Sequence, residues 1–295
     1  MPQNVITQKD ALTAFSSLGI LPGQTLIFHS SIKSIGWVEG GAKSIADALM
    51  QAVGQDGTLV APTFTFSRPA EERPVLDPEA DSCDTGAINA AVMKVPGARR
   101  TVAYTHSFAV AGRNQQLICD LPPENCPLGD KGVFGRLYEL DARVLLLGVA
   151  YTHCTAGHFA EYLCDVPFRM RVSAPAQIRC ADGTLKQVEL ELYGPKPGVP
   201  YPERDFNRAG NMLEEQGRVA VGSLGNAVLR LFSLRDFVDL VCEKWRCGDY
   251  ILSPAAGESE RTRLKDGKMQ EIWFTDSLGN RQHTVRSILR LPDEQ

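Results

Sequence analysis

The chain has 295 residues, of which 43% are hydrophobic and 22% are charged, and its formal net charge is −4. These are ordinary values for a soluble globular protein with room for one large core. The acidic balance and scattered basic residues disfavour nucleic-acid binding, which needs a clustered basic face. No apolar run reaches membrane-spanning length, and the first ten residues lack signal-peptide features. We therefore expect a cytoplasmic enzyme with no nucleic-acid or membrane partner.

The eight cysteines contain no C-x-x-C pair and show no regular spacing. A zinc site or a disulfide framework is therefore not expected. Most of these side chains should act as small buried hydrophobes that stay reduced.

The first part of the chain reads as a β-α-β unit. Apolar periodicity and glycine-containing turns predict a helix over 9–18, a strand over 25–31, a helix over 43–53 and a strand over 58–66. Such a unit favours a mostly parallel sheet covered by helices on both faces. The predicted fold class is therefore α/β, a three-layer sandwich with a mostly parallel central sheet.

Residues 67–85 are proline-rich and acidic, which predicts a long irregular surface loop of the kind that contacts substrates. Beyond it, the pattern predicts a helix over 85–93, a strand-like stretch over 101–112, a helix over 133–139 and a buried strand over 143–149.

The second half begins with a predicted β-hairpin that turns at Ala181-Asp182-Gly183. Glu189 and Glu191 lie two apart on its return strand and therefore share a face. Helices are expected over 206–215 and 233–244. We expect residues 1–250 to form the catalytic domain and residues 251–295 to form an appendage with a second β-hairpin.

The stretch CTAGHFAEY follows directly on the apolar strand VLLLGVA. Loops at the carboxyl ends of sheet strands are where α/β proteins build their sites. His158 and Glu161 are spaced i, i+3 and so share one helix face, with Thr155 in the N-cap position. Imidazole titrates near neutrality and suits acid–base work. Taken alone, the segment fits a structural histidine as well as a catalytic one.

Three other chemistries compete with acid–base catalysis as the function of this segment. His153, His158 and Glu161 resemble a metal-ligand set, but there is no H-E-x-x-H pattern and no second ligand cluster, so no metal is expected. Cys154 is a candidate nucleophile for thioester hydrolysis if a histidine activates it. A nucleophile elbow, G-x-S-x-G, does not occur. A histidine general base is the favoured interpretation.

The stretch HSSIKSIGWVEGGAKSIADALMQAVGQDGTLVAPTF resembles the opening block of the antibiotic N-acetyltransferase family, which includes the aminoglycoside 3-N-acetyltransferases. THSFA at 105–109, LYELDARVLLLGV, the T-x-x-H-x-x-E at 155–161, GSLGNA and LRDFVD are similar to later blocks, in the same order. The resemblance covers roughly residues 5–245. It implies acetyl-coenzyme A as co-substrate, a primary amine as acceptor, and direct transfer without an acyl-enzyme.

The resemblance implies catalytic roles for Thr155 and for His158 as general base, a role that contributes roughly 10²–10⁴-fold. It further implies that Glu191, or Glu189 two residues before it, orients the imidazole. Glu161 is then a secondary acid that either positions the acceptor amine or caps the local structure.

The same resemblance implies a coenzyme site after the first strand, where backbone amides and hydroxyls can hold a pyrophosphate. His29, inside that strand, is expected to be structural. The candidate coenzyme-binding residues are Ser30, Ser31, Ser34, Thr105 and Ser107.

The acceptor is the least constrained part of the interpretation. A polycationic acceptor needs a carboxylate-lined cleft, which Glu72 and Asp77 on the acidic loop are expected to supply, although Arg68 opposes it. RTVAY also departs from the family's usual R-S-x-H-P. We expect the 3-amino group of an aminoglycoside as acceptor; the alternatives are a non-aminoglycoside amine, such as an amino sugar or a biosynthetic intermediate, and an inactive coenzyme A-binding module. The chain is expected to be a monomer or a homodimer.

Overall fold

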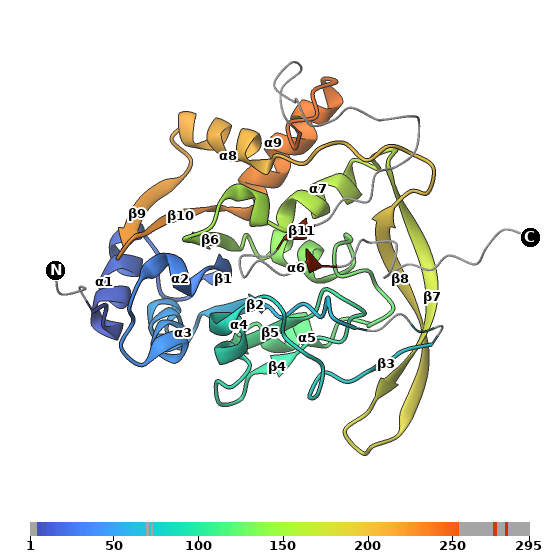
Figure 1. Cartoon of the computed structure of the whole chain (residues 1–295), viewed down its shortest axis with the longest axis horizontal. Helices are drawn as coiled ribbons and strands as arrows, with labels where there is room; N and C mark the ends of the chain where they lie inside the picture. Colours follow the sequence, from blue (N-terminus) through green and yellow to red (C-terminus); the bar gives the residue numbers. More distant parts are fainter. Residues whose placement is uncertain (1–4, 69–70, 72, 254–273, 276–280, 283–295) are drawn as a thin grey trace, which may run out of the picture.

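The computed structural model describes residues 5–68, 71, 73–253, 274–275 and 281–282. Its centre is a seven-stranded sheet in the order β4-β5-β2-β1-β6-β10-β9 (Figure 1). The strands are β1 (Thr25–Ser30), β2 (Thr58–Pro62), β4 (Arg99–Arg100), β5 (Phe108–Gly112), β6 (Arg143–Leu147), β9 (Ala220–Leu224) and β10 (Ala227–Ser233).

The sheet is mixed, so the expectation of a mostly parallel sheet holds only at its centre. β1 pairs in parallel with β2 and β6, whereas β5, β4, β10 and β9 join by antiparallel pairing. For the pair β9–β10 the connection explains the antiparallel direction. Only Gly225 and Asn226 separate β9 from β10, and a parallel crossover needs a dozen residues or more.

Helices cover both faces of the sheet, as expected. Alternate strand residues divide between two cores because successive side chains point to opposite faces. Ile27 and Val144 belong to one core, and Leu26 and Leu145 to the other. The first core is covered by α5 (Gln115–Cys119), α6 (Val133–Glu139), α7 (Ala156–Leu163), α8 (Phe206–Glu215) and α9 (Leu234–Arg246). The second is covered by α1 (Gln8–Leu18), α3 (Gly41–Val53) and α4 (Ala87–Val92).

A long hairpin stands beside the main sheet (Figure 1). β7 (Arg169–Arg179) and β8 (Leu185–Pro195) pair antiparallel along their whole length, which confirms the predicted hairpin and its turn at 181–183. β3 (Val75–Leu76) adds in parallel to β7. The stretch predicted as an irregular loop over 67–85 therefore contains a short strand.

Four short elements complete the described chain: α2 (Ile32–Ile35), the 3₁₀ turn η1 (Tyr151–His153), and β11 (Phe274–Thr275), which pairs antiparallel with β12 (Arg281–Gln282). Most of the predicted appendage over 251–295 lies outside the described residues, so the division into two parts stays a prediction. In the part of the chain that is described, we find no helix with the length and apolarity to span a membrane.

Candidate active site

The candidate site lies where the three parallel strands end. Ser30 is the last residue of β1, Thr63 follows β2 and Gly148 follows β6. β5 runs the other way and begins at the same edge, so the segment 105–107 that precedes it joins this group. Ligands of open α/β sheets bind outside the carboxyl ends of such strands.

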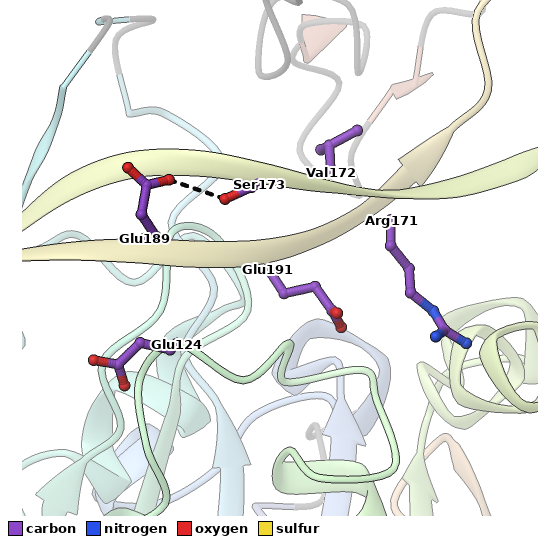
Figure 2. Close-up of a pocket in the computed structure, with 6 residues that line it drawn as sticks. All are labelled: Glu124, Arg171, Val172, Ser173, Glu189 and Glu191. Carbon is purple, nitrogen blue, oxygen red and sulfur yellow. Dashed lines mark hydrogen bonds between the residues drawn. The ribbon is translucent and has the colours of Figure 1, made fainter.

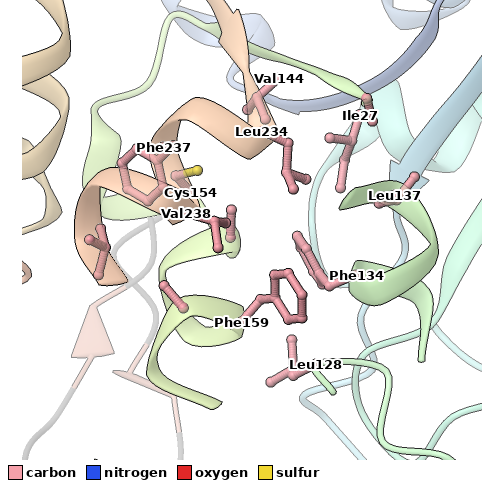
Figure 3. Packing of buried hydrophobic residues seen from close by; sticks show 14 of the residues in the cluster. Ile27, Leu128, Phe134, Leu137, Val144, Cys154, Phe159, Leu234, Phe237 and Val238 are labelled. Atoms are coloured by element: carbon pink, nitrogen blue, oxygen red, sulfur yellow. The ribbon is translucent and has the colours of Figure 1, made fainter. Parts of the chain in front are cut away.

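α7 carries His158 at this edge of the sheet, and the opposite face of the helix packs in the hydrophobic core. Phe159 stacks on Phe134 with ring centroids 6.0 Å apart, and both side chains are buried (Figure 3). Thr155 occupies the predicted N-cap position, but its backbone is helical, with φ −61° and ψ −18°, and its hydroxyl does not cap the helix. Packing of the apolar face therefore sets the orientation of α7.

Cys154 lies in the same core, among residues such as Phe237 and Val238 (Figure 3). Its side chain is fully buried, and burial raises the pKa of its thiol to about 12. A protonated, packed thiol is a poor nucleophile, so the geometry opposes the Cys154 alternative. Among the described residues, no three His, Cys, Asp or Glu side chains are arranged to hold a metal ion.

His158, Glu161 and Arg169 form one contact group. Nδ1 of His158 lies 2.8 Å from Oε2 of Glu161, and Nε of Arg169 lies 2.7 Å from the same oxygen. Nη2 of Arg169 is 2.9 Å from Nδ1. The side chains are 15%, 0% and 7% exposed, respectively. These three groups therefore interact with little water between them, which strengthens their electrostatic coupling.

The hydrogen-bond pattern assigns the proton on the imidazole. An ionised carboxylate only accepts hydrogen bonds, so we assign the imidazole proton to Nδ1, which then donates to Glu161. Nη2 of Arg169 donates to the hydroxyl of Tyr201 at 2.6 Å. The lone pair of His158 is then on Nε2, which lies 3.4 Å from Nη1 of Arg204.

Burial first, and then the positive charge of Arg169, lower the pKa of His158 from 6.5 to about 4. Burial by itself would raise the pKa of Glu161, but Arg169, His158 and the hydroxyl of Tyr250 bring it down to about 2. The group therefore carries an ionised carboxylate and a neutral imidazole at neutral pH.

Contrary to the prediction, the structure does not bring Glu191 or Glu189 to His158. In the register of the hairpin, Glu191 lies opposite Ser173, whereas the β7 residue that reaches His158 is Arg169. Four residues of strand separate the two positions, about 13 Å. Glu161 replaces them as the partner of the imidazole. The i, i+3 spacing of His158 and Glu161 is the sequence signal for this pair, although the resemblance implies only a secondary role for Glu161.

Glu189 and Glu191 instead line a separate hollow of about 270 Å³ beside the hairpin (Figure 2). Glu189 accepts a hydrogen bond from the hydroxyl of Ser173 at 2.9 Å, and Glu191 accepts one from the hydroxyl of Tyr162 at 2.9 Å. Glu124 contributes a third carboxylate to this hollow.

Three of the four candidate coenzyme serines, Ser30, Ser31 and Ser34, lie together around the end of β1. The hydroxyl of Ser34 donates to the carbonyl of Gly148 at 2.8 Å, and the amide of Ser31 donates to the carbonyl of Leu147 at 2.9 Å. The hydroxyl of Ser30 is 3.3 Å from the side-chain oxygen of Asn89. The bonds of Ser34 and Ser31 join the turn after β1 to the end of β6, and the contact of Ser30 joins β1 to α4.

Thr105 and Ser107 lie at the same edge but are buried, at 8% and 4% exposure. The hydroxyl of Ser107 donates to the carbonyl of Thr63 at 2.7 Å and accepts from Nε of Arg100 at 3.0 Å. Because this hydroxyl is used internally, the geometry opposes the expected contact of Ser107 with the coenzyme.

Asp77 lies at the far end of the hairpin. Its carboxylate accepts from the amides of Glu79 and Ala80 and pairs with Arg179 at 3.0 Å. Arg179 and Arg169 are ten strand residues apart, roughly 33 Å. Asp77 therefore does not share a pocket with His158, contrary to expectation. Glu72 lies outside the described residues.

Arg68 is also structural. Its side chain is 8% exposed, forms an ion pair with Asp81, and donates to the carbonyls of Tyr104 (3.1 Å) and Val75 (2.9 Å). We expected the positive charge of Arg68 to disfavour a cationic acceptor. The carboxylate of Asp81 offsets that charge. His29 is buried at 8% exposure, as expected.

Arg169, Tyr201, Arg204 and Tyr250 were not identified from the sequence. They come from the start of β7, from the segment before α8 and from the segment after α9. No spacing links them to the histidine motif, so the sequence carries no local signal for their convergence.

An α/β fold with a buried histidine–carboxylate pair at the carboxyl edge of its parallel strands is the architecture of an acid–base enzyme. Comparison with known proteins gives the family. Residues 27–245 match the family model described as aminoglycoside 3-N-acetyltransferase. The chain belongs to this family and is an acyltransferase, which confirms the resemblance noted in the sequence.

Individual relatives agree with this assignment. The chain is 30% identical over 259 residues to the SPbeta prophage-derived aminoglycoside N(3')-acetyltransferase-like protein YokD of Bacillus subtilis, covering 81% of this chain and 92% of that protein. The crystal structure of aminoglycoside acetyltransferase AAC(3)-Xa matches with a TM-score of 0.72 at 26% identity, over 84% of this chain and 94% of that one. AAC-IIIb, solved as a binary complex with CoASH, matches in fold with a TM-score of 0.72 at 20% identity, over 85% and 100% of the two chains.

Proposed function

We propose that the protein transfers the acetyl group of acetyl-coenzyme A to a primary amine, the 3-amino group of an aminoglycoside, with His158 as general base. Family membership supports the reaction class. The observation that carries the proposal is the neutral imidazole of His158, whose Nδ1 is bound by Glu161 and whose Nε2 keeps its lone pair.

The proton transfer follows from this geometry. As the amine nitrogen attacks the thioester carbonyl, it becomes strongly acidic, and Nε2 of His158 accepts its proton. Glu161 then stabilises the imidazolium through the bond to Nδ1. The carbon–sulfur bond breaks, and the imidazolium of His158 returns this proton from Nε2 to the departing sulfur, so that coenzyme A leaves as the thiol and His158 is again neutral. The low pKa of His158 keeps the base unprotonated before the amine arrives.

The coenzyme is proposed to bind at the edge that carries Ser30, Ser31, Ser34 and Thr105. Their hydroxyl and backbone groups suit a pyrophosphate and a pantetheine amide, and the structural relative AAC-IIIb was solved with CoASH. Bound there, acetyl-coenzyme A supplies the activated acyl group.

The test is thiol release from acetyl-coenzyme A with a panel of aminoglycosides and simpler amino sugars. His158→Asn should lower kcat by roughly 10²–10⁴-fold and leave coenzyme A affinity, measured by calorimetry, unchanged. Glu161→Gln should lower kcat, whereas the matched change Glu191→Gln should not. Full turnover by His158→Asn, or a kcat loss confined to Glu191→Gln, would contradict the assignment.

A non-aminoglycoside amine is a second candidate acceptor. The observation in its favour is Asp77, a carboxylate expected to receive a polycation, which instead pairs with Arg179 far from His158. Turnover with simple amino sugars but with no aminoglycoside in the panel would favour this candidate. Tight coenzyme binding with no turnover for any amine would favour the inactive binding module and refute the enzyme proposal.

A further inference from the structure

The guanidinium of Arg169 is buried and is enclosed by neighbouring side chains. It lies over the rings of Tyr193 and Tyr201, at 5.1 Å and 5.2 Å from the ring centroids. It forms an ion pair with Glu161 and donates to the Tyr201 hydroxyl from both Nε and Nη2. A buried guanidinium is retained only when it is paired and hydrogen-bonded. Every part of this environment holds the guanidinium against the carboxylate that also binds His158.

The shared oxygen makes the charge of the imidazole depend on Arg169. Oε2 of Glu161 lies 2.8 Å from Nδ1 of His158, which donates to it, and is ion-paired with Arg169, whose Nε lies 2.7 Å away. With Arg169 in place, the carboxylate is already neutralised, and protonation at Nε2 would give the imidazole a positive charge beside the guanidinium, whose Nη2 lies 2.9 Å from Nδ1. Without Arg169, a proton on His158 would become the nearest counter-charge of a buried carboxylate.

We propose that Arg169 is a positioning residue that keeps His158 uncharged by neutralising Glu161 and by holding its guanidinium beside the imidazole. The importance of Arg169 for catalysis rests on the proposed function, because only an uncharged imidazole can take a proton from the amine. Its effect on the imidazole itself can be measured in the free protein.

Other groups around the contact group act in addition to Arg169. Arg204 approaches Nε2 from the segment before α8 and adds repulsion there. His106 faces the group from the segment before β5, and burial lowers its pKa to about 3, so it is neutral at neutral pH. The titratable and charged groups that face His158 or its carboxylate partner are Glu161, Arg169, Arg204, His106, Tyr193, Tyr201 and Tyr250.

The first experiment is the pH profile of kcat/KM for wild type and Arg169→Gln. The acidic limb should move upward by about one to three pH units in the variant, the range for loss of a charge within contact distance. Activity should recover toward the wild-type value at high pH. Arg169→Lys keeps the charge and should keep the acidic limb close to that of wild type.

The second experiment needs no substrate. Nitrogen-15 NMR of the histidine side chains in the ligand-free protein reports the charge and tautomer of each imidazole, and the His158 signal is the one that His158→Asn removes. We expect a mainly neutral imidazole with its proton on Nδ1 in wild type at pH 5, and half or more of the imidazole in the charged form in Arg169→Gln at the same pH. If no amine supports turnover, the proposed function fails, while this measurement still decides the role of Arg169.

Arg171→Gln is the matched control. It removes an arginine from the same strand, one whose guanidinium lies over the Tyr162 ring at 4.2 Å, and it should leave the acidic limb in place. A neutral His158 in Arg169→Gln, with activity lowered equally at all pH values, would overturn the proposal and leave Arg169 a structural role. If Arg169→Gln does not fold, a shifted limb or a charged His158 in Arg169→Lys overturns it instead.

Discussion

His29 should make the protein sensitive to mild acid, independently of catalysis. It lies in β1 with 8% exposure. Burial first, and then the neighbouring His153, lower its pKa from 6.5 to about 3. Between these two pH values the unfolded chain binds a proton that the folded chain does not. The free energy of unfolding is therefore highest above pH 6.5 and falls as the pH falls through this window.

The size of the effect follows from the window. At pH 5 the loss from one such histidine is about 2 kcal/mol, since one pH unit corresponds to about 1.4 kcal/mol. His106 and His158, whose pKa values burial lowers to about 3 and about 4, add losses of the same sign. Glu161 does not contribute at pH 5, because the stability from its lowered pKa is lost only below its ordinary value of 4.5.

The measurement is urea unfolding of wild type and His29→Leu, followed by circular dichroism at pH 7.5 and pH 5.0 and extrapolated to water. Any packing effect of leucine is present at both pH values, and the other histidines are common to both chains, so both cancel in the comparison. The variant should lose about 2 kcal/mol less than wild type between the two pH values. Equal losses in the two proteins would refute the reasoning.

Two further predictions concern packing and charge. A Cβ at Gly157 would lie 2.5 Å from the Phe206 ring, which packs edge-on against His158. Gly157→Ala should therefore cost about 1–3 kcal/mol and lower kcat, and adding Phe206→Leu should recover stability; a neutral Gly157→Ala would contradict this. Arg68→Met leaves Asp81, whose side chain is only 15% exposed, without its ion-pair partner and should cost about 3–5 kcal/mol, measured by urea unfolding. Arg99→Met, whose pair with Asp120 is about half exposed, should cost under about 1 kcal/mol, and equal costs would sink the argument.

Much of the local structure could be predicted from the sequence. The helices over Val133–Glu139 and Phe206–Glu215 have the predicted bounds, and the hairpin turns at 181–183 as expected. These features depend on apolar periodicity and turn residues, which are local in the chain. The β-α-β unit likewise predicted the parallel pairing of β1 and β2.

The order and direction of the outer strands were harder to predict. β5 and β10 pair antiparallel with the parallel centre, because the chain returns to the sheet from the opposite direction. Long-range pairing of this kind depends on which strands meet in the folded chain. A short loop such as that between β9 and β10 is the one local signal for it.

The histidine motif after the strand VLLLGVA predicted the edge of the sheet at which the candidate site lies, and the ordered sequence blocks identified the family. Only the tertiary structure decided the partner of His158. The resemblance implies Glu191 or Glu189 as the partner and gives Glu161 a secondary role, but the hairpin register leaves Glu191 four strand residues from Arg169. The sequence likewise does not show that Arg68 pairs with Asp81. The folded chain brings the two side chains together where they are largely shielded from water. The state of a charged group depends on the partners that folding brings within a few ångströms, and the linear chain does not encode those distances locally.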